Sequence, residues 1–145
     1  MIANRTLTGA LSTAAGVILL TSAVVAETIT FTSKLDGASE VPPSASTGTG
    51  TLTASFDTAS KQLTWTGSTS GLTGDATAAH FHGPADVGGN APVAVPMASF
   101  KATFTGAAAL TEAQMANLLA GKWYVNIHTA KNTNGEIRGQ LVKDK

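Results

Sequence analysis

The three histidines of the chain lie in two short segments that alternate as β-strands do. His80 and His82 belong to residues 79–83, and His128 belongs to residues 124–129. Successive side chains of a strand point to opposite faces, so His80 and His82 share the face opposite the apolar Phe81 between them. If the apolar side chains of both segments face a core, all three imidazoles point outward. Pairing of the two strands would then bring them together.

Three imidazoles at one point would form a metal site. Neutral histidine is the commonest metal ligand, and residues i and i+2 of a strand lie about 6.5–7 Å apart, so both rings can lean to one ion at about 2.0–2.1 Å. Nitrogen ligands without thiolate suit Cu(II) or Zn(II), and the Irving–Williams order favours copper. The sequence therefore predicts copper, with zinc as the alternative, on His80, His82 and His128. Two other interpretations stay open: hydrogen bonding between the strands without metal, and direct contact with a partner.

Further polar residues are candidates to orient the metal ligands through hydrogen bonds. Four of them lie in the last two strand-like segments: Tyr124, Asn126, Glu136 and Gln140. Glu136 and Arg138 share a strand face, where a solvent-screened ion pair is expected, and the alternative is that Arg138 draws an anion toward the metal. Asp86 is a candidate fourth ligand, although a solvated loop carboxylate is the expected role.

Strand signals dominate the remaining chain. Alternating apolar and polar residues predict strands over residues 27–35, 51–56, 63–67, 76–83, 95–105, 122–129 and 136–142. One helix is predicted after Thr111, which caps Gln114, and it ends at Gly121. Trp65 and Trp123 are expected to anchor the core. The predicted fold class is all-β: an immunoglobulin-like or Greek-key antiparallel β-sandwich of about seven strands with one short helix. Residues 40–48 are predicted to form a loop outside the core.

The N-terminus and the composition limit the function classes. Residues 1–26 are predicted to be a signal peptide, since Arg5 precedes an apolar stretch and small residues end at Ala26. The stretch is shorter than the about 20 apolar residues of a membrane span, so no stable membrane insertion is expected after cleavage. Loss of Arg5 changes the formal net charge from +0 to −1, which argues against nucleic-acid binding. The absence of cysteine excludes disulfides and thiolate chemistry. The expected location is secreted or periplasmic.

Five motifs occur in order along the chain, at residues 35–43, 48–50, 79–85, 124–129 and 135–141. Together they resemble the CHRD domain, named after chordin, over roughly residues 29–142, so residues 27–145 are expected to form one such domain. The resemblance implies an exported, immunoglobulin-like β-sandwich module of the single-domain bacterial type. A looser likeness at the level of the fold is to Cu,Zn superoxide dismutase, although a fourth histidine, a zinc loop and a cysteine pair are missing here.

The sequence thus predicts an exported metal-binding β-sandwich that binds, buffers or carries copper or zinc at a surface site of three histidines. The alternative is a structural module that binds other exported proteins or surfaces without metal. A dismutase-like or hydrolytic metalloenzyme is the least favoured function, because no general acid or base is identified beside the histidines.

Overall fold

The structure is a computed structural model, and it describes residues 25–145. Almost all of the predicted signal peptide lies outside the described residues. Within residues 25–145, no helix has the length and apolar character needed to cross a membrane.

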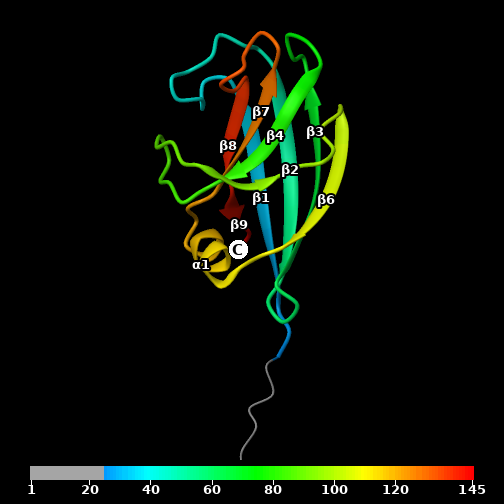
Figure 1. Ribbon diagram of the computed structural model, residues 1–145, viewed down its shortest axis with the longest axis vertical. Coiled ribbons are helices and arrows are strands. Elements are labelled where there is room, and N and C mark those ends of the chain that lie inside the picture. Colours follow the sequence, from blue (N-terminus) through cyan, green and yellow to red (C-terminus); the bar gives the residue numbers. More distant parts are fainter. Residues whose placement is uncertain (1–24) are drawn as a thin grey trace, which may run out of the picture.

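Alternation of apolar and polar residues produces nine strands and one helix in the described residues (Figure 1). The strands are β1 (Thr28–Asp36), β2 (Thr49–Asp57), β3 (Gln62–Ser70), β4 (Ala76–His82), β5 (Val93–Pro96), β6 (Thr103–Ala109), β7 (Tyr124–Thr129), β8 (Ile137–Gln140) and β9 (Val142–Lys143). The helix, α1 (Glu112–Leu119), connects β6 to β7.

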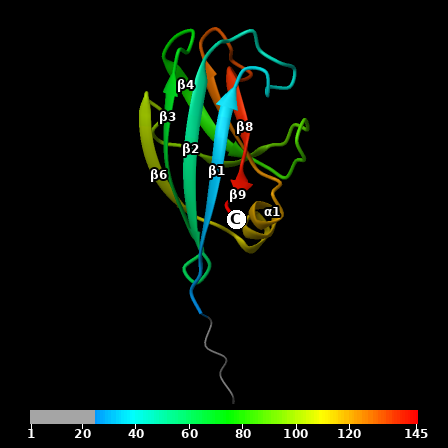
Figure 2. The same cartoon turned by 180° about the vertical axis from the view of Figure 1, so that it is seen from behind.

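The strands pair into one antiparallel sheet that folds over on itself. Its order is β5-β4-β7-β8-β1-β2-β3-β6, with β9 paired to β1. Figures 1 and 2 show β1, β2, β3 and β6 in one layer and β4, β7 and β8 in the other. The chain crosses between the layers after β3, after β5 and through α1, which are connections of the Greek-key kind, and it crosses again between β8 and β9. The predicted all-β antiparallel fold with one short helix is confirmed.

Two of the predicted strands are each divided in two, which accounts for nine strands instead of about seven. The segment predicted over residues 95–105 is β5, paired with β4, and β6, paired with β3, because the intervening residues cross between the layers. The segment predicted over residues 136–142 is β8, paired with β7, and β9, paired with β1. Alternation continues through both breaks because both layers turn apolar side chains toward the same core, so the pattern alone did not reveal them.

The core between the layers determines the direction of the histidines. Phe81 of β4 lies edge-on to Trp65 of β3, with ring centroids 5.1 Å apart, and 5.7 Å from the ring of Trp123. Both tryptophans are buried, as predicted. Gly106 of β6 leaves room for this packing, since a Cβ there would lie 2.3 Å from Cζ2 of Trp65. With Phe81 fixed inward, the neighbouring side chains of β4 must point outward.

Helix α1 closes one end of the sandwich (Figure 1). The backbone N–H of Gln114 donates to Oγ1 of Thr111 at 3.2 Å, and the backbone N–H of Thr111 donates to Oε1 of Gln114 at 2.9 Å. This is the predicted capping box. Leu118 is buried, whereas Leu119 stays exposed. Gly121, with φ of +72°, follows the helix as predicted.

Candidate metal centre

Strands β4 and β7 bring the three histidines together on the outer face of their layer. The register pairs His80 with Asn126, and it places His128 opposite Ala78. The ring centroid of His80 lies 5.4 Å from that of His82 and 5.0 Å from that of His128. One nitrogen of each ring lies within 4.8 Å of the other two, and all three side chains are half-buried. The expected convergence of the three rings is therefore present in the structure.

The backbone orients two of the three imidazoles. Nδ1 of His82 lies 3.0 Å from the carbonyl oxygen of Ala91, and Nδ1 of His128 lies 2.9 Å from the carbonyl oxygen of Thr133. A carbonyl oxygen can only accept, so both Nδ1 atoms carry a proton, and in a neutral imidazole with this tautomer the lone pair is on Nε2. Metal-ligating histidines are commonly held in this way, with the second ring nitrogen bonded to a carbonyl or carboxylate.

The third imidazole approaches one of these lone pairs. Nδ1 of His80 lies 3.2 Å from Nε2 of His128. Two nitrogen ligands on one tetrahedral ion would be about 3.3 Å apart, and without an ion the same distance is a hydrogen bond donated by His80. Hydrogen bonding alone leaves the cluster incomplete, because Nε2 of His82 is buried and has no partner in the described part of the chain. A shared ion would satisfy all three nitrogens.

Burial keeps two of the histidines in the form that binds metals. Desolvation is the largest cause that lowers the pKa of both His80 and His82. Repulsion from His128 lowers both pKa values further, whereas the hydrogen bond to the carbonyl of Ala91 acts in the opposite direction at His82. Both imidazoles are thus neutral at neutral pH, and their lone pairs need not compete with a proton for a metal ion.

Tyr124 fixes the position of His82 from the adjacent strand. The two rings are stacked, with centroids 4.9 Å apart and an interplanar angle of 2°. The backbone N–H of Ala91 donates to Oη of Tyr124 at 3.2 Å, and the carbonyl of the same residue orients His82. Arg138 contacts the Tyr124 ring as well, with Cζ 3.4 Å from the ring centroid. The tyrosine therefore joins the loop after β4, the imidazole and β8 into one unit.

Arg138 is buried and does not form the expected ion pair with Glu136. Only 2% of Arg138 is exposed, and its guanidinium donates to Oδ1 of Asn90 at 3.0 Å and to the carbonyl of Gly89. The prediction of a solvated pair is wrong because the loop after β4 covers this face of β8. The same contacts occupy the guanidinium and keep its charge away from the surface. The alternative role, in which Arg138 draws an anion toward the metal, would need that charge at the surface.

Glu136 belongs to a separate polar cluster, formed where several loops meet. Its carboxylate accepts hydrogen bonds from Ser46, Thr129 and Asn132 and from both the backbone and the hydroxyl of Thr73. Desolvation raises the pKa of Glu136, but these hydrogen bonds outweigh it and lower the pKa to about 2. None of these partners is a histidine, so Glu136 anchors loops and does not orient a metal ligand.

Asp86 and Gln140 hold the loops around the site. Asp86 pairs with Lys122, its side chain is 82% exposed, and it is not among the clustered ligand atoms. Its expected role as a loop carboxylate thus agrees with the structure better than a role as fourth ligand. Gln140 donates to the carbonyls of Ala85 and Gly121, at 3.2 and 2.9 Å.

One buried carboxylate near the site was not recognised from the sequence. Glu40 lies in the loop predicted to be outside the core, yet it is 6% exposed and accepts a hydrogen bond of 2.6 Å from Nδ2 of Asn126. Desolvation raises the pKa of Glu40 to about 7, although Arg138 acts to lower it. Gly135, at φ of +132°, makes room, since a Cβ there would lie 2.5 Å from Oε1 of Glu40. The available signal was the place of Glu40 in the motif at residues 35–43.

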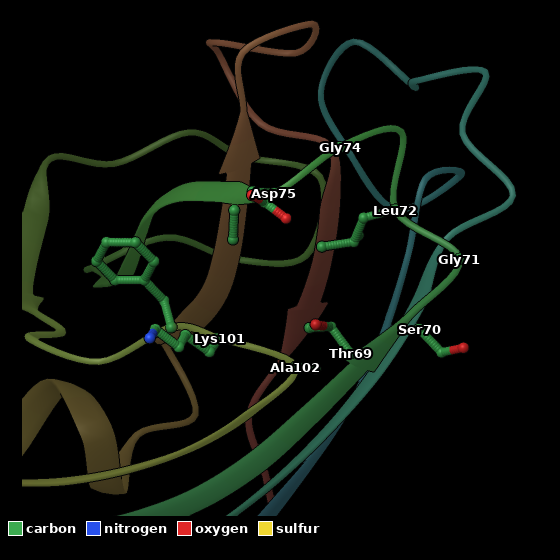
Figure 3. Close-up of a pocket in the computed structure, with 10 residues that line it drawn as sticks. Thr69, Ser70, Gly71, Leu72, Gly74, Asp75, Lys101 and Ala102 are labelled. Carbon is green, nitrogen blue, oxygen red and sulfur yellow. The ribbon is translucent and has the colours of Figure 1, made fainter.

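A pocket of about 710 Å³ opens at another place, where the loop after β3 faces the segment before β6. Figure 3 shows Leu72 directed into it, with Asp75 and Lys101 at its margins and Ser70 turned away. No histidine lines this pocket, and the group of possible metal-ligand side chains found in the described residues lies on the outer face of β4 and β7.

A comparison with protein-family models places this site in a known domain. The model of the CHRD domain matches residues 31–141, from within β1 to the residue after β8. The chain belongs to the CHRD domain family. CHRD domains are typically extracellular modules, and the match includes all three histidines. No curated protein and no solved structure matches the chain.

Proposed function

We propose that this CHRD protein is an exported metal-binding β-sandwich that binds, buffers or carries copper, with zinc as the alternative ion. The proposal is carried by the convergence of one ring nitrogen from each of the three histidines, together with the buried Nε2 of His82, which has no partner among the described residues. A buried polar atom without a partner costs about 1–3 kcal/mol, and coordination of an ion would remove that cost.

The donor set supports the choice of ion. Three neutral nitrogens without carboxylate or thiolate suit Cu(II) and Zn(II), and copper binds more tightly to a given nitrogen site. Two nitrogen ligands on opposite sides of one ion are at most about 4.2 Å apart. The three ring nitrogens here lie within 4.8 Å of one another, so ring movements of about an ångström would bring them to coordination distance. Three ligands leave a coordination position open for a further ligand.

Metal titration of the purified protein tests the proposal. Calorimetry is expected to show saturable binding of one equivalent of Cu(II), tighter than Zn(II), and the electron paramagnetic resonance spectrum is expected to show nitrogen couplings. The double variant His80→Ala/His82→Ala should lose this binding. Asp86→Asn is the matched control, since it removes an exposed acid outside the ligand group and should bind copper normally. Absence of saturable binding, or binding that survives the double variant, would reject the proposal.

Export is the second part of the proposal. The sequence pattern of residues 1–26 supports it, and β1 begins at Thr28, so cleavage after Ala26 would leave every strand of the sandwich complete. Mass spectrometry of protein recovered from outside the cytoplasm is expected to give a chain that begins at Glu27. An uncleaved chain confined to the cytoplasm would contradict it.

The outer face of the other layer favours a second candidate function, the binding of other exported proteins or surfaces. Its centre is a row of exposed threonines in register across four strands: Thr32, Thr53, Thr66 and Thr105. The row offers methyl and hydroxyl groups, with Asp144 at the end where Thr32 donates to its carboxylate. The variant Thr53→Glu/Thr66→Glu should lose partners captured from the surrounding medium while it still binds copper. Unchanged capture by this variant would count against the function.

A further inference from the structure

We propose that Asn126 is a positioning residue of the metal site, whose Oδ1 accepts a hydrogen bond from a water molecule in the open coordination position. The inference rests on the proposed metal binding and deepens it, because it names the class of further ligand that the site favours. Ligands that carry a proton, such as water, would be preferred over ligands without one.

The register places Asn126 among the histidines. It lies directly opposite His80 of β4 and two residues before His128, on the same face of β7. Its other neighbour on that face, Tyr124, stacks on His82. The carboxamide therefore rises from the strand between the positions that carry the three ligands. It is only 4% exposed, so its polar atoms need partners inside the protein or at the site.

One end of the carboxamide is fixed, and the other has no partner. Nδ2 donates to Oε1 of Glu40 at 2.6 Å, in the space left by the missing Cβ of Gly135. Because this hydrogen bond directs Nδ2 toward the loop that carries Glu40, Oδ1 is turned away from that loop. Oδ1 is buried and accepts no hydrogen bond from the described residues. It is the second such atom on this face, after Nε2 of His82.

The side chains around Asn126 have their donors engaged elsewhere. The protons on Nδ1 of His82 and His128 are directed to backbone carbonyls. The hydroxyl of Tyr124 lies near the carbonyl of Ala91, and the guanidinium of Arg138 donates to the loop after β4. Oδ1 of Asn126 is therefore open to a donor from a molecule bound at the site.

A bound water accounts for this acceptor better than direct coordination does. Carbonyl oxygens suit hard ions such as magnesium and calcium, whereas the three nitrogens here suit copper or zinc. A water molecule on the ion has two protons to donate, and an amide oxygen in a buried position is a strong acceptor for one of them. Both unpartnered atoms of this face are then satisfied by one hydrated ion.

Azide binding to the copper-loaded full chain tests the role of Asn126, because azide displaces water without replacing its hydrogen bond. Asn126→Ala is expected to bind azide about five-fold more tightly than the wild type, the equivalent of one neutral hydrogen bond of about 1 kcal/mol. Its copper affinity should stay within about threefold, because all three ligands remain. Thr53→Ala, on the outer face of the other layer, is the control and should leave azide affinity unchanged.

A second variant and a second measurement keep the test decisive if Asn126→Ala does not fold. Glu40→Leu/Asn126→Leu removes both partners of the buried hydrogen bond and should show the same tighter azide binding. Water-proton relaxation of the wild-type copper protein should reveal one water on the ion. Unchanged azide affinity in a copper-binding variant, or a wild-type ion without water, overturns the role of Asn126 alone. Failure of the wild type to bind copper overturns the proposed function, and this inference with it.

Discussion

Two polar clusters of this sandwich differ in how completely their hydrogen bonds are satisfied. In the Glu136 cluster, both carboxylate oxygens accept hydrogen bonds, and the donors come from three loops and β7. In the histidine cluster, Nε2 of His82 and Oδ1 of Asn126 are buried without partners among residues 25–145. Both clusters include side chains of β7, and they differ in the side chains that the neighbouring segments bring to that strand.

The difference indicates separate roles for the two clusters. A buried network in which every group is paired stabilises the fold, and it has no capacity left for a ligand. A network with unpaired groups is costly unless something binds there, and such departures from satisfied bonding are expected at functional sites. The comparison thus indicates a structural role for Glu136, and it supports the proposed binding role of the three histidines.

The largest expected effect is the loss of stability in Glu136→Ala. The substitution leaves several buried donors without an acceptor, so the free energy of unfolding should fall by about 3–5 kcal/mol. Urea denaturation of the metal-free protein measures it. A loss below about 1 kcal/mol would show that the cluster does not hold the loops together, and the contrast between the clusters would fail.

The histidine cluster should respond to metal instead. His82→Phe keeps an aromatic ring against Tyr124. It removes an unpaired nitrogen together with the hydrogen bond to the Ala91 carbonyl, and these opposing effects leave an expected change below about 1 kcal/mol without metal. At a free metal concentration of 100 times Kd, the wild type should gain about 2.7 kcal/mol of unfolding free energy, and the variant should gain none. Denaturation with and without Zn(II) measures both. Equal stabilisation of the two proteins would contradict the assignment.

The two buried glutamates predict pH effects of opposite sign. The folded-state pKa of Glu40 is raised from 4.5 to about 7, so Glu40 lowers stability as pH rises through that range. The pKa of Glu136 is lowered to about 2, so its stabilisation is complete above pH 4.5 and is lost as pH falls toward 2.

Metal-free Glu40→Gln isolates the first effect, because the variant lacks the ionisable carboxyl at residue 40 and the protein is otherwise unchanged. The unfolding free energy of the variant relative to the wild type should rise by about 1–2 kcal/mol between about pH 5 and pH 8, a figure reduced for solvent screening. A difference that does not change with pH would mean that Glu40 is charged throughout and that its burial has no electrostatic cost.

The smallest expected effect is on the outer face of the other layer, which is the reference for both clusters. Thr66 is exposed and lies opposite Thr53 and Thr105 in the sheet. Thr66→Ala should change the free energy of unfolding by at most about 0.5 kcal/mol and leave metal binding unchanged. A larger change would show that threonines in register contribute to the sheet as much as buried polar groups do.

Local pattern was sufficient for the strands, the helix cap and the direction of the histidines. Phe81 lies between two polar side chains, and Thr111 lies three residues before Gln114, so each feature is determined by neighbours in the sequence. The pattern failed where the chain crosses between layers, since residues on both sides of a crossing still face one core. It also failed at Arg138, because the loop that buries it comes from a distant segment.

The sequence by itself determined that three imidazoles would stand on the outside of a β-sandwich, because alternation along a strand is a local property of the backbone. Only the tertiary structure decided which polar groups would be enclosed and which would find partners. Loops from distant parts of the chain bury Glu40, Asn126 and Glu136 on the same side of the fold. Whether each buried group finds a hydrogen-bond partner depends on the donors that those loops bring. Periodicity in the sequence does not indicate which distant loops will come into contact.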